Sequence, residues 1–274
     1  MSFVAEFLKS VAAEGEACIR LSAHLRLESI LCVPVDVLHL DDDVLVVMKP
    51  SGLLAQPDHT GDADVLTNAK ARLATRLETQ DPFLGLVHRL DRPTSGLMVL
   101  ARTSAAARSL SAQFRERTVS KLYVALVEGT LRGIGRWTDY IAKPGRRPTL
   151  VPPEDPDGKR AELEWQALGR TKTHTLLQVR LHTGRPHQIR LQASDRGHPV
   201  VGDQRYGATT SSKGILLHHA VLRIDHPSQP RRLTFTAAPP TAWNRHLSDD
   251  LRAAVTRMLE QAGPSPTTDS TEHQ

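Results

Sequence analysis

Short apolar runs separated by turn residues extend along most of the chain, and their spacing predicts more strands than helices. The runs at 37–40 and 44–48 flank the acidic turn 41–43, a pattern that predicts a β-hairpin. Other apolar runs have the length and the flanking turn residues of strands. They lie at 97–101, 119–127, 161–167, 173–181, 215–224 and 232–236.

Three segments have the features of helices. Asp64 is an N-cap residue for a helix that runs to about 80, with Val65, Ala69, Leu73 and Leu77 at four-residue spacing. Thr103 caps a second helix, whose apolar face holds Ala107, Leu110 and Phe114. A third helix follows Pro186, which suits a first helical turn, and Gly197 closes it. Strands and helices do not alternate regularly, so we expect an α+β fold: a mixed, mainly antiparallel sheet with flanking helices.

The composition of the chain changes near its two ends. Residues 1–34 have apolar stripes at helical spacing and predict a helical N-terminal extension. Residues 35–262 form the expected main domain, and the polar residues 263–274 predict a disordered tail. Inside the main domain, 129–158 is rich in Gly, Pro and Arg and is expected to be a long exposed connection.

The charge of the chain favours a polyanionic partner. Its 274 residues carry 35 Lys and Arg against 30 Asp and Glu, a formal net charge of +5. Two cysteines cannot build a disulfide framework or a four-cysteine zinc site, which favours a reducing compartment. There is no apolar run long enough to span a membrane and no secretory signal pattern, so we expect a cytoplasmic protein.

The loop after the apolar residues 83–87 carries the first candidate chemistry, with the sequence HRLDRPTSG at 88–96. Asp91 lies there between Arg89 and Arg92, which we expect to hold its carboxylate ionised. In one interpretation Asp91 only accepts hydrogen bonds in a turn. In the other it is a nucleophile or a base, as carboxylates are at sugar carbons.

A second cluster, TGRPHQIR at 183–190, lies at a predicted strand-to-helix junction. Backbone donors and basic side chains meet there, so the turn suits an anion, although its basic residues could simply be solvated. Arg190 follows Ile189 in a segment whose inner face should be buried, and it therefore needs an acid partner. Tyr123 lies in the strand 119–127, where it either packs in the core or stacks on a base.

These motifs together resemble the RluA family of pseudouridine synthases. The resemblance covers about Val37 to Ala238, with the motifs in the order of the family. No counterpart of the N-terminal RNA-binding module of some members is found. The segments that carry the resemblance are VLVVMKPSGLL, HRLDRPTSG, the K-x-Y of Lys121 and Tyr123, GRPHQIR, GHPVVGDQRYG and LLHHA.

The resemblance implies an enzyme that isomerises uridine in ribosomal or transfer RNA after flipping the base, without a cofactor or a metal. It implies that Asp91 is the catalytic carboxylate, that Tyr123 stacks on the uracil and that Arg190 pairs with Asp91. Whether Asp91 attacks C1′ or removes a sugar proton stays open. Arg89 is similar to the residue that fills the space of the flipped base. The other residues expected to build or contact the RNA cleft are Lys49, Arg92, Lys121, Arg185 and His187.

Two other classes of protein fit parts of this sequence. A metalloenzyme is suggested by thirteen histidines, but their spacings match no metal-binding pattern. A non-catalytic RNA-binding protein of the same fold would have no use for an ionised acid facing phosphates. We therefore expect an isomerase that acts as a monomer.

Overall fold

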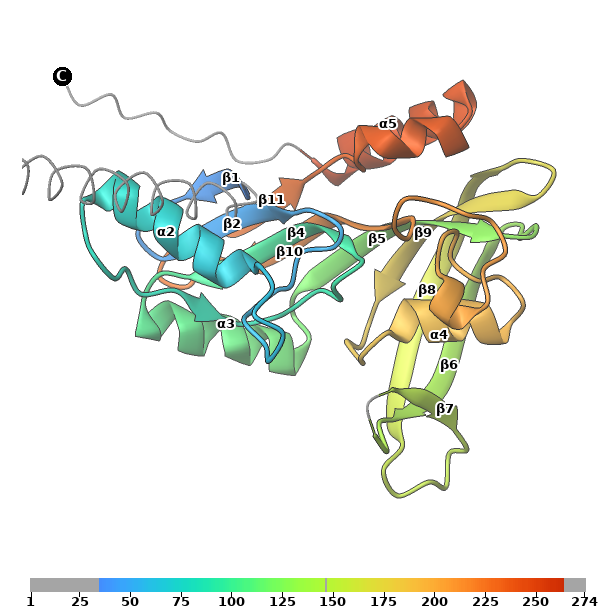
Figure 1. Cartoon of the computed structure of the whole chain (residues 1–274), viewed down its shortest axis with the longest axis horizontal. Helices are drawn as coiled ribbons and strands as arrows, with labels where there is room; N and C mark the ends of the chain where they lie inside the picture. The colour runs from blue at the N-terminus through green and yellow to red at the C-terminus, as the bar shows by residue number, and fades with distance from the viewer. Residues whose placement is uncertain (1–34, 146, 264–274) are drawn as a thin grey trace, which may run out of the picture. The chain divides into compact units, whose positions relative to one another are not determined.

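The computed structural model describes residues 35–145 and 147–263, and its strands form one eleven-stranded sheet (Figure 1). The strands along the sheet are, in spatial order, β1 (Asp36–Leu40), β2 (Val44–Lys49), β4 (Ser95–Ala101), β10 (Leu217–Asp225), β5 (Ser120–Glu128), β9 (His174–Leu181), β8 (Lys159–Arg170), β6 (Ile134–Ala142) and β7 (Thr149–Val151). Two further strands lie beside this path: β3 (Gly85–Leu86) pairs with β4, and β11 (Arg232–Thr236) pairs with β10. Among the described pairs, only β4 and β10 run parallel, so the expected α+β fold with a mainly antiparallel sheet is confirmed.

The helices begin close to the predicted residues. Asp64 caps α2 (Val65–Leu77) and Thr103 caps α3 (Ser104–Glu116), each by accepting a bond from a backbone N–H of the first turn. The third helix, α4 (Gln188–Asp195), begins after His187, so Pro186 precedes the first turn instead of lying in it. The structure adds α5 (Asp249–Ala262) and two short 3-10 helices, η1 (Gln204–Tyr206) and η2 (Thr241–His246). Within the described residues, no helix is both long and apolar enough to cross a membrane.

The core is divided among separate apolar clusters against which the helices pack. Residues of α2 and α4 share one cluster with Tyr123 and the inner residues of β2, β4 and β9. The helix α3 packs on β4 and β10 through Ala106 and Leu110. The helix α5 packs on β8, β10 and β11, and its Leu251, Val255 and Met258 join a third cluster with alternate residues of β5. The predicted alternation of β5 is therefore correct: Tyr123 and Leu122 belong to different clusters.

One prediction of an element was wrong, and one helix was missed. The segment 129–158 is not a long connection, because it contains β6 and β7. In β6 only Trp137 and its last two residues are buried, while Ile134 is 79% exposed, so the strand lacks a clear apolar run. The missed helix α5 does carry apolar residues at helical spacing. The extension expected at 1–34 and the tail expected beyond Gly263 lie outside the described residues.

The short parallel contact between β4 and β10 brings the loop before β4 close to the centre of the sheet. Gly96 pairs with His219 there, and its φ is +124°. A Cβ atom built on Gly96 would lie 2.4 Å from the carbonyl oxygen of His219 and 2.5 Å from its nitrogen. Only glycine fits at this position, because both neighbouring atoms belong to backbone that cannot move aside.

We therefore expect Gly96→Ala to lower the free energy of unfolding by about 3 kcal/mol or more, from the clash and the backbone strain together. Urea unfolding measures the change. Gly61→Ala is the matched control, since Gly61 also has a positive φ, +72°, but no atom within 4 Å of its added Cβ. The control should lose about 1 kcal/mol. Equal losses in the two variants would contradict the role of the close approach.

Candidate active site

Lys49, the last residue of β2, supports the loop that carries Asp91. The ammonium group of Lys49 donates to the carbonyl oxygens of Pro50, Arg92 and Thr94 at 2.9, 2.9 and 2.8 Å. Burial lowers the pKa of Lys49 to about 7, and the nearby charge of Asp91 opposes this shift. Lys49 is 0% exposed, so of its two expected roles it can help to build the cleft but presents no surface to RNA. Its three bonds support the loop instead.

Asp91 lies against a buried arginine that it shares with a second acid. Nη1 of Arg190 is 3.2 Å from Oδ2 of Asp91. On its other edge, Arg190 donates from Nε and Nη2 to the two carboxylate oxygens of Asp203, at 2.6 and 2.9 Å. Burial works against the charge of Arg190, but Asp203 and Asp91 outweigh it and raise its pKa. The arginine therefore stays charged beside Asp91, and the acid partner that the sequence required for Arg190 is present.

Sequence reasoning missed Asp203 and Tyr206, although both lie in the GDQRYG segment that supported the resemblance. Asp203 is 1% exposed, and its only described ion-pair partner is Arg190. Tyr206 lies under the guanidinium of Arg190, whose central carbon is 4.9 Å from the ring centroid. A signal for Asp203 existed: a buried arginine whose first acid partner is partly exposed to water needs a second, buried acid to compensate its charge.

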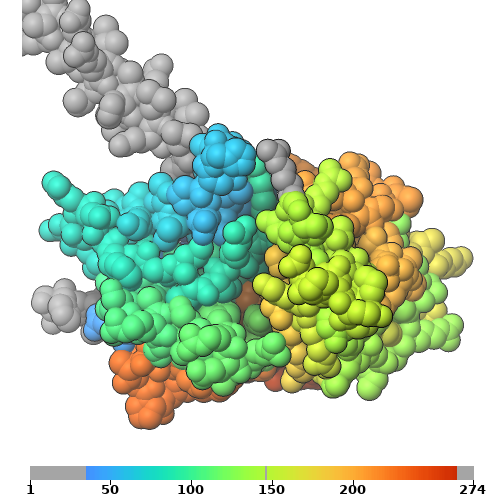
Figure 2. Space-filling model, turned by 90° about the horizontal axis from the view of Figure 1, so that it is seen from below, coloured from blue at the N-terminus to red at the C-terminus, as the bar shows by residue number. Residues whose placement is uncertain are grey.

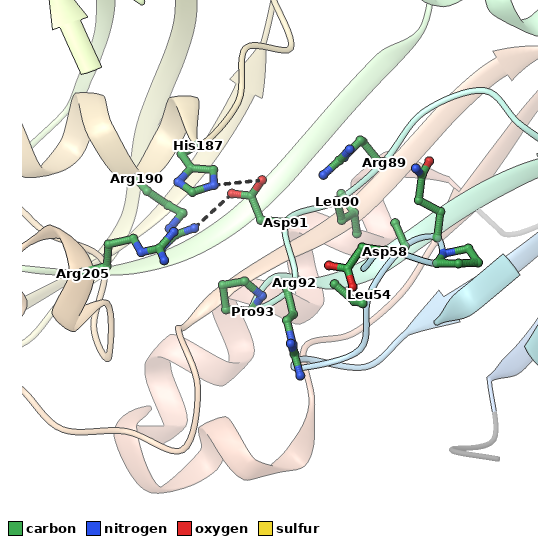
Figure 3. Close-up of a pocket in the computed structure, with 13 residues that line it drawn as sticks. Leu54, Asp58, Arg89, Leu90, Asp91, Arg92, Pro93, His187, Arg190 and Arg205 are labelled. Atoms are coloured by element: carbon green, nitrogen blue, oxygen red, sulfur yellow. Dashed lines mark hydrogen bonds and ion pairs between the residues drawn. The ribbon is translucent and has the colours of Figure 1, made fainter. Parts of the chain in front are cut away.

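His187 also contacts the carboxylate of Asp91. In Figure 3 it lies beside Arg190, and dashed lines join both residues to Asp91, with Nε2 of His187 4.0 Å from Oδ1 of Asp91. Its Nδ1 is hydrogen-bonded to the hydroxyl of Tyr206 at 2.7 Å. His187 has a φ of +54°, an uncommon conformation for a residue with a side chain. Burial lowers the pKa of His187 although the charge of Asp91 raises it, so the ring is neutral at neutral pH.

The two arginines that flank Asp91 in sequence have other positions than expected. Arg92 extends away from Asp91 in Figure 3, donates from Nη1 to Asp62 at 2.7 Å and from Nε to the carbonyl of Gly52 at 2.9 Å. Arg89 is exposed and makes no hydrogen bond or ion pair within the described residues. The expectation that this pair holds Asp91 ionised is wrong, since Arg190 is the guanidinium in contact with it.

Two pockets meet at Asp91. The larger, of about 450 Å³, is lined on one side by residues 54–58 and on the other by His187, Arg190 and Arg205. The smaller, of about 80 Å³, reaches Tyr123 and the turn at 184–187. Both include the loop from Arg89 to Asp91 in their walls. In Figure 2 the surface is hollowed between the green residues of α3 and the yellow-green residues of β6 and β7.

Tyr123 forms a wall of the smaller pocket with its ring supported from behind. The ring stacks on His219, with centroids 4.5 Å apart and an angle of 17° between the planes. Burial, together with the charge of Asp91, raises the pKa of Tyr123 far above its usual value, so the phenol is protonated at neutral pH. His219 donates from Nδ1 to the carbonyl of Leu97 at 2.7 Å, and burial lowers its pKa to about 3. A neutral, fixed imidazole therefore sets the plane of the tyrosine ring.

The remaining predicted residues lie around the smaller pocket. Arg185 lines it, and its Nε donates to the carbonyl of Arg160 at 3.0 Å. Lys121 lies beside Gly184, on whose backbone an added Cβ would be 3.7 Å from Nζ of Lys121. The structure thus brings Asp91, Tyr123 and Arg190 to one site. Among the described residues, no group of His, Cys, Asp and Glu could hold a metal ion.

Comparisons with known proteins show the family of the chain. The family model described as RNA pseudouridylate synthase matches residues 43–195. Ribosomal large subunit pseudouridine synthase D of Yersinia pestis is 36% identical over 224 residues, which are 76% of this chain and 68% of the relative. Ribosomal large subunit pseudouridine synthase C of Vibrio cholerae is 35% identical over 238 residues, covering 82% and 69% of the two chains.

A solved structure shares the fold. Human RNA Pseudouridylate Synthase Domain Containing 4 matches 76% of this chain and 92% of its own, with a TM-score of 0.64 and 24% sequence identity. In this fold, a carboxylate in contact with a buried arginine lies at the opening of a cleft. The chain belongs to the RNA pseudouridylate synthase family, and its resemblance to the RluA family is confirmed. It is an RNA pseudouridine synthase, an isomerase that acts on RNA.

Removing Asp203 should be costly, because the buried charge of Arg190 would then be compensated only by the partly exposed Asp91. We expect Asp203→Asn to lower the free energy of unfolding by about 3–5 kcal/mol. Asp225→Asn is the matched control: Asp225 also binds an arginine, Arg232, at 3.0 Å, but both side chains are about half exposed. The control should lower the free energy of unfolding by less than about 1 kcal/mol. Urea unfolding measures both changes, and equal changes in the two variants would contradict this account.

Proposed function

We propose that Asp91 is the catalytic carboxylate of this synthase, that Arg190 keeps it ionised and aimed, and that Tyr123 stacks on the target uracil. One observation carries the proposal: the 3.2 Å contact between Arg190 and Asp91, at the place where two pockets join. The side chain of Asp91 is 25% exposed, whereas that of Arg190 is 4% exposed. The acid can therefore reach a substrate while its partner stays in the protein.

The reaction breaks the bond between C1′ of the ribose and N1 of uracil and joins C1′ to C5. Asp91 either adds to C1′ or removes a proton from the sugar, and both steps require its ionised form. Either step consumes the negative charge of Asp91. Arg190 is not left without a counterion when this happens, because Asp203 still binds its other edge with two hydrogen bonds.

The target uridine must leave its stack before Asp91 can reach its sugar. Sites for small ligands have volumes of about 300 Å³ or more, and the larger pocket meets this size. It joins the smaller pocket, which Tyr123 lines, at Asp91. Arg89 is exposed at the wall of both pockets, a position that supports its proposed role in filling the space of the flipped base. We also propose RNA contacts for Arg92, Lys121, Arg185 and His187.

The kind of RNA is proposed from the relatives. Two of them are named ribosomal large subunit pseudouridine synthases, which supports ribosomal RNA as the substrate of this chain, with transfer RNA as the alternative. Such a substrate agrees with the cytoplasmic location predicted from the sequence. We keep the monomer as the proposed state.

Replacing the acid tests the catalytic role directly. Asp91→Asn should abolish isomerisation and leave RNA binding equal or tighter, because the amide keeps the shape of the side chain and removes a negative charge facing phosphates. Tritium release from RNA labelled at C5 of uridine measures the reaction, and filter binding measures affinity. Asp58→Asn is the matched control, since Asp58 lines the larger pocket but does not contact Arg190. Residual turnover in Asp91→Asn would refute the assignment. A wild-type protein that binds RNA without releasing tritium would favour the non-catalytic alternative.

Mapping pseudouridine identifies the substrate. Ribosomal and transfer RNA from host cells with and without the gene should differ at one or a few uridines, and those in large-subunit ribosomal RNA are expected to change. The purified protein should restore the same positions in RNA from the deletion strain. Loss confined to transfer RNA would overturn the ribosomal assignment.

A further inference from the structure

Three cationic side chains from distant segments gather beside the smaller pocket. Arg117 follows the last residue of α3, Lys121 is the second residue of β5, and Arg185 lies in the turn before α4. The pairing of Leu122 with Arg180 puts Lys121 opposite the end of β9, where that turn begins. This placement agrees with the proximity of Lys121 to Gly184.

These three residues, called here the cation cluster, have no counter-charge within the described residues. None of them takes part in an ion pair with an acid. Burial lowers the pKa of Lys121, and the charge of Arg117 lowers it further. Burial and Arg117 act in the same way on the pKa of Arg185. Like charges held together and partly removed from water are unfavourable unless an anion joins them.

The cation cluster is also fixed in place, as a binding site would be. The backbone N–H of Arg185 donates to Oε1 of Gln188 at 3.1 Å, and that oxygen also accepts from Thr183 at 2.7 Å. The bond from Nε of Arg185 to the carbonyl of Arg160 leaves its two terminal nitrogens available. Arg117 is held in a left-handed conformation, with φ of +63°, at the C-cap of α3. The backbone at Arg117 and Arg185 and the Nε of Arg185 are therefore fixed, so that three separate elements present cations to the same place.

We propose that Arg117, Lys121 and Arg185 bind one phosphate of the RNA strand next to the target uridine. The inference rests on the proposed roles of Asp91 and Tyr123. Lys121 and Tyr123 are two residues apart on the same face of β5, so their Cα atoms are separated by about 7 Å. A nucleotide whose base lies on Tyr123 has its own phosphate within reach of Lys121 and of the arginines beside it.

The chemistry of the ligand follows from its surroundings. Uridine carries no charge, so the attraction that brings a nucleotide into the pocket must come from its phosphates. Guanidinium groups match the non-bridging oxygens of a phosphate, and an ammonium group adds a point charge. Arg205, a further cation near Asp91, lines only the larger pocket, whereas Arg185 of the cluster lines the smaller one. Binding one phosphate here fixes the strand relative to Asp91 and so selects which nucleotide is presented to the acid.

The first test removes single charges. The ligand is a synthetic RNA stem-loop that the wild-type protein isomerises. Arg117→Gln should raise the dissociation constant of this RNA about tenfold, the effect of losing one charged hydrogen-bonding group. It should also lower the slope of log affinity against log salt by about 1. Lys121→Gln should do the same, and it keeps the test valid if urea unfolding shows that Arg117→Gln does not fold. Arg115→Gln is the matched control, since Arg115 lies on α3 two residues earlier, is 73% exposed and is near only Glu116.

The second test removes the charge from the RNA. Stem-loops carrying a single neutral methylphosphonate at each linkage around the uridine are bound to the wild-type protein and to Arg117→Gln. At one linkage the neutral group should weaken wild-type binding more than Arg117→Gln does, and it should weaken binding by the variant less than it weakens binding by the wild type, because only Lys121 and Arg185 then still contact that phosphate. At every other linkage the two losses should add.

Additive losses at every linkage, or equal effects of Arg117→Gln and Arg115→Gln, would overturn the phosphate site. Both measurements use binding alone. Failure of the proposed catalytic roles would show instead as turnover in Asp91→Asn, so the two failures are distinguishable.

Discussion

Arg190 is the residue on which the geometry of the site depends. It is buried at the start of α4, binds Asp203 with two hydrogen bonds and still has one nitrogen directed at Asp91. A buried arginine with a single acid in front of it would be paired only as long as that acid kept its charge. With Asp203 behind it, the positive charge is compensated throughout the reaction, and Asp91 is free to change its own charge.

The sheet brings together groups that are far apart in the sequence. Asp91 comes from the loop before β4, Tyr123 from β5 and Arg190 from α4, which follows β9. The close approach of Gly96 to His219 joins β4 to β10, and the next strand along the sheet is β5. His219 then stacks on Tyr123, so the same strand that anchors the acid-bearing loop also sets the plane of the aromatic ring. The distance between acid and ring is thus fixed by backbone pairing.

Much of this arrangement could be predicted from the sequence. The motif around Asp91, the need of Arg190 for an acid and the alternation around Tyr123 are local patterns that single segments display. A second acid for Arg190 could be expected, but neither its identity as Asp203 nor the role of Lys49 could be predicted, because both depend on which distant atoms meet. Nothing in the run 44–48 indicates that the next residue donates to carbonyls forty positions later. The strand β6 was missed because few of its side chains are buried, so it shows no clear apolar run.

The hydrogen bonds from Lys49 to the loop that carries Asp91 affect how this enzyme loses activity when it unfolds. One buried ammonium group binds the carbonyls of residues 92 and 94, directly after the acid. If β1 and β2, which form one edge of the sheet, separate from β4, those carbonyls lose their donor and Asp91 loses its fixed direction. The enzyme would then lose activity before the central strands unfold, because the hairpin of β1 and β2 separates first.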